Sequence, residues 1–594
     1  MQTFPEKRHT FKVIADTFNT NCFYEVADSP EIEILPGEAD AIHLVYPQTP
    51  KRDEPFEVTV RVVDSWGNPA QEFNGSITLD GGKEFKGLLR TVSFDSGDRG
   101  IRILPGITVE GDDPYRLKAS DNYGLKSMGP ALVPAGNEDL NLFWGDTHGQ
   151  TRSTVGTGTV EEYYSFARDK ARVDIAAWQG NDLRVRKEDW DEVQRETGRF
   201  HEPGRFVTLL GYEWSGLRSG GGDHNIYYSG DREQIHRSFH ARIDDYRDRD
   251  TNRFPISELW NTFRGRKNVV SVAHVGGRCC NLDFYDSEFV RLIEVHSHHG
   301  TFEWLIEEAI DRGMKVGFTG GSDDHTGRQG LVYPNRPGKS VVTFDARGGL
   351  MGLYAQELTR EAVFSAMQNR RTYGTSEDRM LLSVKSGHHW MGEEFSVSDP
   401  PEVDVEMMRG KEVIYSHPIN RMTNGKSPHR RIRVQWSGVS QKSGRSKQVV
   451  WKGSILIRNG SIEKAKGYAL DQFDDRVQRI SSQRVDFDTR TSGDLNGAML
   501  DINCREESKL NFSCGFMGFS VSLSEITEDG LVFTGGECNE KIIVSMLSPD
   551  LSETDAAFSF KDTSPLPGCT PYWVKVSQLN GGQAWSSSMY INQV

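Results

Sequence analysis

The sequence predicts a multidomain protein that combines α/β and all-β structure. The chain has 594 residues, which is too long for a single hydrophobic core. Short apolar stretches alternate with turn residues near both ends, whereas the middle of the chain alternates apolar runs with amphipathic helical patterns. These observations predict four segments: a leader at 1–37, a β-sandwich at 38–138, an α/β domain at 139–378 and a second β-sandwich region at 379–594.

Regular alternation of apolar and polar residues defines the first β-sandwich. It predicts strands at 56–63, 75–79 and 100–104, and the turn-forming run 64–68 follows the first of them. The segment is about 100 residues long, the usual size of a two-sheet sandwich. The stretch 62–69 also resembles turns of bacterial immunoglobulin-like domains, so we expect an Ig-like sandwich.

The middle of the chain reads as alternating strands and helices. Such alternation implies a parallel sheet with helices outside it, either an α/β barrel or a doubly wound fold. The apolar runs predict buried strands at 206–210, 269–273, 292–295 and 316–319. The helical patterns predict helices at 160–171, 304–312 and 360–371.

Strand patterns return after about residue 376. The alternation predicts strands at 380–384, 403–407, 432–436 and 454–458, broken by turns rich in Pro, Gly and Ser. Residues 442–452 are locally basic, which favours a solvated hairpin over a nucleic-acid patch. We therefore expect a second, larger β region.

Composition limits the classes of partner. The net charge of −15 and the isoelectric point of about 5.6 argue against general binding to nucleic acid or anionic membranes. The sequence shows no apolar run of about 18 residues and no secretory signal. Its seven scattered cysteines have no zinc-binding spacing. These features predict free thiols and a cytoplasmic protein that acts on a small molecule, with homo-oligomers left open.

Histidines and carboxylates gather where the predicted strands end. Asp146 and His148 are two residues apart, as are Asp323 and His325, so each pair can point the same way from an extended chain. Between them lie further candidates after apolar runs: Glu213, His224 and His274. Because α/β barrels keep their sites at strand C-terminal ends, this set predicts a metal-dependent hydrolase.

Six motifs carry a family resemblance. In chain order they are GDxH, GxEW, GGxHN, AHxGG, ExxSxHG and GSDDH, between Gly145 and His325. The set resembles the PHP superfamily, the polymerase and histidinol phosphatase-type metal hydrolases, and more closely its DUF3604-type subgroup. The resemblance implies a distorted (β/α)7 barrel that holds up to three divalent ions.

The resemblance also implies roles for individual residues. It makes Glu213 a carboxylate that bridges two ions, and Glu213, Asp323 and His325 the catalytic groups. The implied metal ligands are His148, Gln150, Glu213, His224, His274, Asp323 and His325. For every residue the alternative is structural, such as a buried ion pair for Glu213 or a turn cap for His224.

Two positions depart from the family pattern. Gln150 stands where a second His of the first motif is usual, and its neutral amide oxygen is a weaker ligand. Asn181 stands where a third-ion His is usual, with Asp182 beside it as a substitute. We therefore expect one or two ions of Zn, Mn or Fe. Asp146 is expected to orient a ligand His rather than bind metal.

Loop arginines beside the ligands suggest an anionic substrate. A guanidinium suits phosphate or carboxylate, although a salt bridge to a loop acid is the alternative. The candidate substrate-binding residues are Arg152, Arg278, His299 and Arg328. Cys279 and Cys280 are interpreted as structural thiols, because no pattern of a thiol protease accompanies them.

These features predict metal-dependent hydrolysis of a small anionic molecule. The family resemblance favours a phosphoester. One alternative is cleavage of an amide, ester or lactone-like bond at the same centre, since a metal site also activates water for acyl transfer. The other is a degenerate barrel that serves as a binding or scaffold module, which Gln150 and Asn181 keep open.

Overall fold

The computed structural model describes most of the chain and is mostly β with few helices. Two compact units are present, one up to Gly136 and one from Leu140 onward. None of the described helices is long and apolar enough to cross a membrane. The described residues are 2–136, 140–240, 242–243, 247–334, 346–376, 378–397, 402–403, 407–415, 428–440, 447–470, 474–528, 530–536, 538, 540–547, 559–578 and 580–593.

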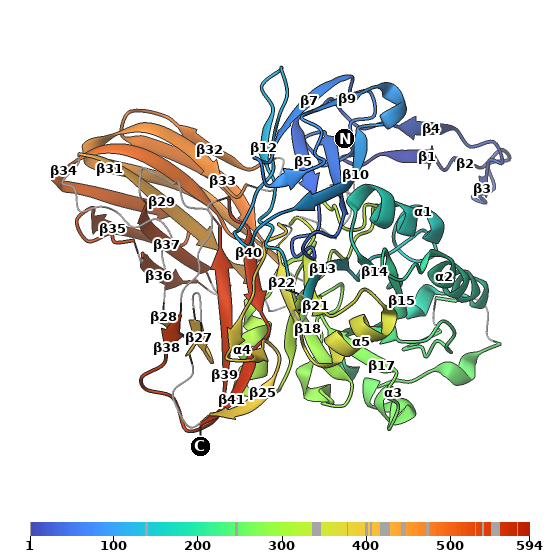
Figure 1. The fold of residues 1–594 in the computed structure, drawn as a ribbon. Coiled ribbons are helices and arrows are strands. Elements are labelled where there is room, and N and C mark those ends of the chain that lie inside the picture. Colours follow the sequence, from blue (N-terminus) through green and yellow to red (C-terminus); the bar gives the residue numbers. More distant parts are fainter. Residues whose placement is uncertain are drawn as a thin grey trace. The chain divides into compact units, whose positions relative to one another are not determined.

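The N-terminal unit contains two four-stranded sheets (Figure 1). One sheet has the order β5 (Ala41–Val45), β6 (Phe56–Val63), β10 (Ile101–Val109) and β8 (Phe85–Lys86). The other has the order β12 (Lys126–Met128), β11 (Lys118–Ser120), β7 (Gly75–Asp80) and β9 (Thr91–Phe94). Alternate residues of β6 and β7, such as Val58, Val60 and Ile77, fill a shared core. The three strands expected in this segment are therefore confirmed.

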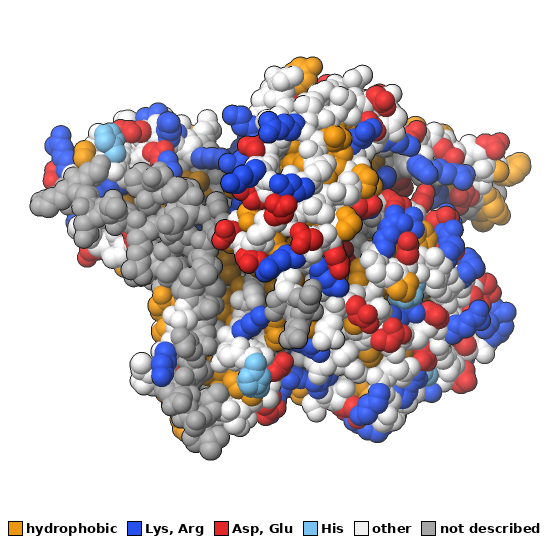
Figure 2. Space-filling model, in the orientation of Figure 1, with side chains coloured by type: hydrophobic (Ala, Val, Ile, Leu, Met, Phe, Trp, Pro, Cys, Tyr) orange, Lys and Arg blue, Asp and Glu red, His pale blue; other side chains and the backbone are white. Residues whose placement is uncertain are grey.

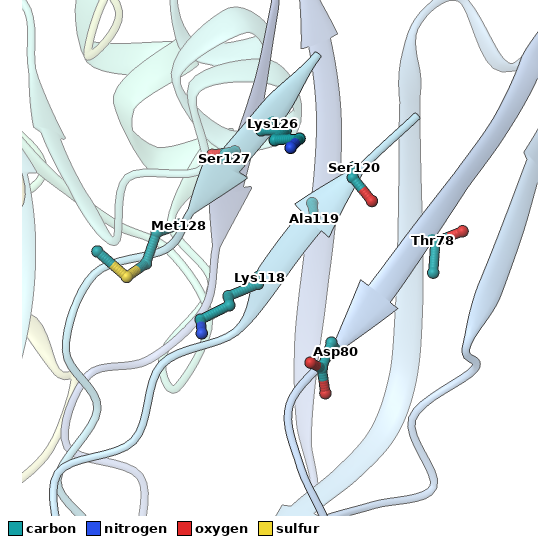
Figure 3. Close-up of a pocket in the computed structure, with 8 residues that line it drawn as sticks. All are labelled: Thr78, Asp80, Lys118, Ala119, Ser120, Lys126, Ser127 and Met128. Carbon is teal, nitrogen blue, oxygen red and sulfur yellow. The ribbon is translucent and has the colours of Figure 1, made fainter. Parts of the chain in front are cut away.

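The leader also forms strands. Two short antiparallel pairs occur there: β1 (Glu6–Thr10) with β4 (Glu31–Ile34), and β2 (Ile14–Ala15) with β3 (Tyr24–Glu25). A concavity of about 460 Å³ opens on the sheet formed by β7, β11 and β12 (Figure 3). It is lined mainly by polar side chains, among them Asp80, Lys118 and Lys126, and by none of the predicted site residues.

A curled sheet forms the centre of the second unit. Its strands follow the order β18 (Val290–Ser297), β17 (Val269–Ala273), β16 (Asp223–Tyr228), β15 (Val207–Ser215), β14 (Ile175–Ala177), β13 (Asn141–Asp146), β21 (Leu350–Ala355) and β22 (Thr372–Thr375). β20 (Gly317–Gly320) pairs with the outer side of β18, and the short β19 (Gly300–Thr301) follows β18. The ends of the sheet approach each other, because a Cβ on Gly374 of β22 would meet the backbone of Thr319 in β20.

The expected (β/α)7 barrel is not confirmed. β13–β14–β15 and β17–β18–β20 are parallel, as expected. β16, however, pairs antiparallel with both β15 and β17, and β21 pairs antiparallel with β13 and β22. Only seven residues join β15 to β16, too few for the helical crossover that parallel neighbours need.

Helices cover this sheet on two sides. α1 (Val160–Ser165) begins with a capping box between Thr159 and Glu162 and continues into a π-helical turn. It is followed by α2 (Lys187–Phe200), α3 (Ile256–Phe263), α4 (Glu303–Asp311) and α5 (Arg360–Gln368). The helices expected at 160–171, 304–312 and 360–371 are confirmed, whereas α2 and α3 were not predicted.

Two hydrophobic cores show which strand residues face inward. Leu209, Tyr227 and Val272 pack with Phe364 of α5 in an inner core enclosed by the curled sheet. The alternate residues Leu210, Ile226, Tyr228 and Ala273 belong to an outer core with α1, α2 and α3. Since side chains alternate along a strand, the inner set continues through Glu213, Asp223 and His274 at the end of the sheet beyond this core.

The C-terminal strands extend the central sheet instead of standing apart. β40 (Gln583–Ser586) pairs with β22, and the sheet continues through β39 (Gly568–Ser577) to β41 (Met589–Gln593), β25 (Glu394–Val397), β27 (Met407–Arg409) and β28 (Glu412–Tyr415). Two short antiparallel pairs join β23 (Lys385–Ser386) to β24 (His389–Trp390) and β26 (Glu402–Val403) to β38 (Phe560–Lys561). The predicted strand at 403–407 is described only at its ends.

A second large sheet occupies the rest of the C-terminal part. It has the order β32 (Arg476–Arg479), β33 (Arg484–Thr491), β31 (Lys447–Tyr468), β34 (Asn496–Cys514), β29 (His429–Ser437), β37 (Glu540–Leu547) and β36 (Leu531–Gly535), with β30 (Val439–Ser440) and β35 (Gly518–Ser522) at its sides. The strands expected at 432–436 and 454–458 are confirmed. Most of the basic stretch 442–452 belongs to β31, but 442–446 lie outside the described residues.

The strand expected at 380–384 is wrong. Residues 380–384 belong to none of the described strands. The carbonyl oxygens of Met380 and Leu382 instead accept hydrogen bonds from the hydroxyls of Tyr373 and Tyr354. The alternation in this stretch reflects burial of Met380, Leu382 and Val384 in the outer core.

Charged side chains are mixed on the surface drawn in Figure 2. Lys and Arg side chains lie among Asp and Glu side chains over that face. On this face the acidic excess of the sequence is therefore not gathered in one patch.

Candidate metal centre

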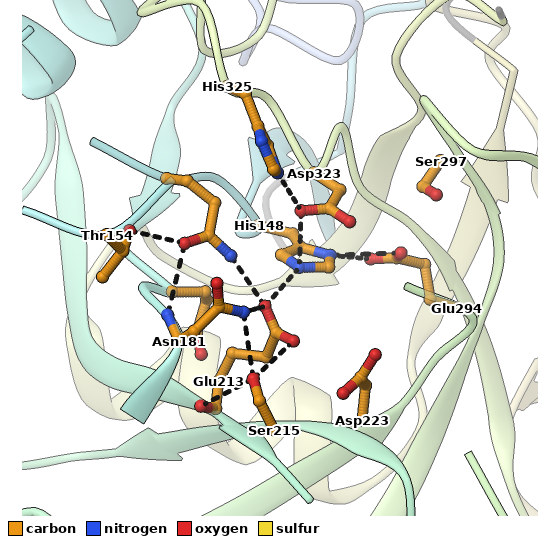
Figure 4. Close-up of polar contacts among 12 residues, drawn as sticks. His148, Thr154, Asn181, Glu213, Ser215, Asp223, Glu294, Ser297, Asp323 and His325 are labelled. Carbon is orange, nitrogen blue, oxygen red and sulfur yellow. Dashed lines mark hydrogen bonds and ion pairs between the residues drawn. The ribbon is translucent and has the colours of Figure 1, made fainter. Parts of the chain in front are cut away.

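The candidate centre lies at one end of the curled sheet. Its residues come from the ends of β15, β16, β17 and β18 and from the loops after β13 and β20. Figure 4 shows the carboxylates of Glu213, Asp223, Glu294 and Asp323 around His148. The side chains of this group are almost fully buried. Residues up to 175 positions apart in sequence thus share one small volume.

Three carboxylates surround the ring of His148. Its Nδ1 lies 3.0 Å from Oε2 of Glu294 and 3.2 Å from Oε1. Its Nε2 lies 3.2 Å from Oδ1 of Asp323 and 3.9 Å from Oε2 of Glu213. Burial disfavours the charged ring, but Asp323 and Glu294 outweigh it and raise the pKa of His148 well above its usual value. A carboxylate on one ring nitrogen aims the other at a metal position.

Asp323 gathers three imidazoles. Besides His148, Nε2 of His299 lies 2.9 Å from its Oδ2, and Nε2 of His325 lies 3.4 Å from its Oδ1. The backbone of Asp323 has φ of +52°, a left-handed conformation that is uncommon outside glycine and is often found at functional sites. His299 therefore faces the centre, and its contact with substrate stays a prediction.

Glycine at position 321 makes room for this arrangement. A Cβ there would collide with the Glu294 carboxylate and would press on Cβ of His148. Gly321 thus allows the loop after β20 to pass directly over the pair formed by His148 and Glu294.

Glu213 accepts three hydrogen bonds. The amide nitrogens of Gln150 and Asn181 both donate to its Oε2, each at 2.7 Å. The hydroxyl of Ser215 donates to Oε1 at 2.7 Å (Figure 4). Burial opposes ionisation, but the neighbouring His148 and His274 lower the pKa of Glu213. The side chain is a fixed, ionised carboxylate.

His274 and Asp223 form the side of the centre opposite Asp323's loop. A Cβ on Gly276 would meet both His274 and Asp223, so the two side chains lie against one turn. Burial and the neighbouring His148 lower the pKa of His274 to about 3, which leaves the neutral ring that binds metals. Burial and then Glu213 raise the pKa of Asp223 well above its usual value.

The residues fit a bound cation. His148, Glu213 and His274 each place a ligand atom within 4.8 Å of the others. Five buried atoms here have no hydrogen bond among the described residues: Nε2 of His148, both ring nitrogens of His274, Oδ1 of Asp223 and Oδ1 of Asp323. Three of these atoms still have ion-pair contacts at 3.2–3.5 Å, whereas a buried polar atom without any partner costs about 1–3 kcal/mol. A divalent ion bound to this nitrogen and oxygen set would remove that cost.

His224 is not part of the centre, which corrects its prediction as a ligand. It pairs across the sheet with Trp214 and Ala273, which belong to the outer core, and its ring lies edge-on to Trp260 of α3. The adjacent Asp223 has the inward position. The sequence does not show which of the adjacent residues Asp223 and His224 faces inward, and the prediction chose the histidine because imidazole is a common metal ligand.

Gln150 reaches the centre, but not as the expected ligand. Its Oε1 accepts from the hydroxyl of Thr154 at 2.6 Å and from the backbone N–H of Asn181 at 3.2 Å. Because these donors fix the amide orientation, its nitrogen is the atom that faces Glu213. Gln150 is a hydrogen-bond donor to a ligand candidate.

The two neighbouring aspartates support loops. Asp146 accepts from the backbone N–H of Ser322 at 2.9 Å and of Gly330 at 2.8 Å, and burial raises its pKa to about 7. Asp146 thus positions the loops around His148, as expected of a supporting residue. Asp182 accepts from the backbone N–H groups of Ser215 and Ser238, so it does not replace a ligand at position 181.

The predicted arginines have different environments. Arg278 lies at the centre: its backbone N–H donates to Asp223 Oδ2 at 2.5 Å, and its Nη1 is 3.5 Å from Oδ1. Arg328 is buried and donates to the hydroxyl of Thr326 and to the carbonyl of Tyr333, and its contact with substrate stays a prediction. Arg152 is exposed, and its backbone N–H donates to the carbonyl of Gly158 at 3.0 Å.

Sequence reasoning missed three residues. Asp223 and Glu294 belong to the centre, and both stand inside the motifs GGxHN and ExxSxHG that carried the resemblance. Arg184 was also missed: burial and the nearby guanidinium groups of Arg242 and Arg278 lower its pKa. Cys279 and Cys280 are buried free thiols, in agreement with their structural interpretation.

A family model and three uncharacterized proteins match parts of this chain. A family model described as "Protein of unknown function (DUF3604)" matches residues 138–268 and 335–407, which confirms the DUF3604-type recognition. Uncharacterized proteins of Chlamydia pneumoniae and Chlamydia trachomatis are 20% and 19% identical over 68% and 67% of this chain. The matched region spans 66% of each relative's own length.

Similarity to solved structures is weak. A two-domain protein from Bacteroides vulgatus, described as containing a predicted PHP-like metal-dependent phosphoesterase, is 10% identical. The match covers 65% of this chain and 96% of that chain, with a TM-score of 0.29. A TM-score this low supports no argument about fold or activity.

Proposed function

We propose that this DUF3604-type protein is a metal-dependent hydrolase of a small anionic molecule. The observation that carries the proposal is the convergence of His148, Glu213 and His274, with buried ligand atoms that lack hydrogen bonds. Such a set of imidazole and carboxylate groups suits Zn, Mn or Fe. The resemblance of the six motifs to the PHP superfamily supports the same reading.

The residues around the centre suggest a division of tasks. A divalent ion bound there would polarise a substrate oxygen and lower the pKa of a water molecule. Asp323 and His325 are placed for proton transfer: the His325 side chain is 17% exposed, and its Nε2 contacts the carboxylate of Asp323. His325 can therefore exchange a proton between a reacting group and Asp323.

Arginines support an anionic substrate. Arg278 is half-buried beside Asp223, and Arg184 lies near both Arg278 and Arg242. The guanidinium groups of Arg184 and Arg278 would suit an anionic ligand. A phosphoester is the leading substrate class, because phosphate accepts paired hydrogen bonds from guanidinium groups. An amide, ester or lactone-like bond is the second candidate, supported by the general chemistry of such centres.

The cysteines support a cytoplasmic location. All seven cysteines are free thiols. Cysteines of secreted proteins are commonly paired in disulfides, whereas those of cytosolic proteins stay reduced. We therefore propose a reducing compartment.

Metal content and a substrate panel test the proposed function. Purified protein should carry a divalent ion and should hydrolyse phosphate monoesters or diesters more quickly than amides and esters. His274→Ala should lose both the ion and the activity. His224→Gln is the matched control, since His224 is a buried histidine on the opposite face of the neighbouring strand. Metal-free wild-type protein without hydrolase activity would favour a scaffold role.

A further inference from the structure

The acceptor capacity of Glu213 limits how many ions the centre can hold. An ionised carboxylate offers about four lone-pair positions. Three are already used by short hydrogen bonds: Oε2 accepts from Gln150 and Asn181, and Oε1 accepts from Ser215. One position remains, which is enough to bind one ion and too few to bridge two ions through both oxygens.

The donors on Glu213 are themselves fixed. Gln150 is held by Thr154 and by the backbone of Asn181, so its amide cannot turn its oxygen toward Glu213 without losing both bonds. The amide nitrogen of Asn181 donates to Ser215 at 2.9 Å as well as to Glu213. The two amides and the hydroxyl therefore form a connected network around one carboxylate.

Charge also argues against a second ion beside this network. Two divalent ions a few ångströms apart repel strongly, and ionised or imidazole ligands are needed to offset that repulsion. On the side of Glu213 that faces Gln150 and Asn181, the side chains offer N–H groups instead. An N–H group directed at the carboxylate leaves no lone pair for a cation there.

We infer that the centre binds a single divalent ion, with Glu213 as a terminal ligand. His148, Glu213 and His274 hold this ion, and Gln150 and Asn181 are positioning residues that fix Glu213. The inference rests on the proposed metal binding. It replaces the bridging carboxylate that the sequence resemblance implied, and it narrows the expected one or two ions to one. Gln150 and Asn181, the two departures from the family pattern, thus act together on the same oxygen of Glu213.

Metal stoichiometry tests the inference directly. Wild-type protein, reconstituted with excess Mn²⁺ and freed of loose ions, should hold one ion per chain by mass spectrometry. Its electron paramagnetic resonance spectrum should show isolated Mn²⁺ without exchange coupling. Two ions per chain, or a coupled spectrum, would overturn the inference and leave the hydrolase proposal standing. No bound ion would refute both.

Replacing the amides should create the missing site. The double variant Gln150→His and Asn181→His removes both donors from Glu213 and supplies two imidazoles. It should bind two ions per chain and show exchange coupling. If the double variant folds and still binds one ion, the amides do not determine the stoichiometry and the inference fails. If it does not fold, the wild-type stoichiometry decides alone.

A milder variant tests the positioning role. Gln150→Met removes the donor while keeping a similar volume, and it should lower the affinity for the single ion about 10–100-fold, as is usual for groups that orient ligands. Gln179→Met is the matched control: Gln179 is equally buried, and its amide contacts the carbonyl of Ile226 at 3.4 Å instead of Glu213. Equal affinities for the two variants would contradict a positioning role for Gln150.

Discussion

Replacing Glu294 by Gln should weaken metal binding without removing a metal ligand. Glu294 contacts His148 through both carboxylate oxygens, at 3.0 and 3.2 Å from Nδ1, and both side chains are buried. The Gln side chain can still accept from Nδ1, but it lacks the charge that makes the ring a stronger ligand. Such changes cost about 10–100-fold in metal affinity, or about 1.4–2.7 kcal/mol.

The loss should depend on pH in a defined direction. A metal ion must displace the proton from His148, and Glu294 is one of the groups that raise the pKa of this ring. In Glu294→Gln the pKa of His148 falls, so proton competition weakens. The affinity difference between wild type and variant should therefore be largest in alkaline solution and should shrink as the pH falls.

Chelator competition measures these affinities. Zn²⁺ or Mn²⁺ Kd values should be determined for wild type and Glu294→Gln across the pH range. Glu303→Gln is the control, because Glu303 is a carboxylate that binds Lys575 and Trp585 away from the centre. That control should lower Tm and leave the Kd unchanged. The reasoning fails if Glu294→Gln binds metal as tightly as wild type, or if the loss grows in acid.

Three further predictions concern the same centre. Asp223→Asn should lower metal affinity strongly, whereas His224→Gln should keep the metal and lose only thermal stability, as metal analysis and calorimetry would show; the reverse order would contradict the strand phase. Metal should be released on acidification at a higher pH than for an ordinary histidine site, because the pKa of His148 is raised, and a release point below that of ordinary sites would count against this. Arg184→Ala should raise KM for an anionic substrate several-fold at unchanged metal content, with a smaller effect at high salt; an unchanged KM would exclude Arg184 from binding.

Much of the candidate site could be predicted from the sequence, because apolar runs indicate where the buried strands end. Apolar runs before Glu213 and His274 marked the ends of β15 and β17, and both residues lie in the centre. The phase of β16 was not visible. Its register is set by antiparallel pairing of Glu213 with Asn225, a long-range fact that no local pattern contains. That pairing turned Asp223 inward and His224 outward.

Gln150 shows a second limit of sequence reasoning. Its position in the first motif predicted a side chain near the metal, which is correct. Its role depends on Asn181 and Thr154, which fix its amide, and a comparison of motifs could not combine these contacts. The antiparallel pairing of β16 with β15 could have been expected. Only seven residues connect the two strands, too few for the crossover helix that parallel pairing needs.

The pairing of β22 with β40 makes the order of synthesis matter. β22 ends at Thr375, whereas its partner strand starts at Gln583, so the edge of β22 stays uncovered while more than 200 further residues are made. The same late segment supports β20, since Ser587 accepts from the backbone N–H of Phe318 at 2.8 Å. An uncovered strand edge invites pairing with other chains. Nascent chains that stop before β40 should therefore be prone to aggregate. In such chains β20, which precedes the loop of Asp323, would also lack its hydrogen bond to Ser587.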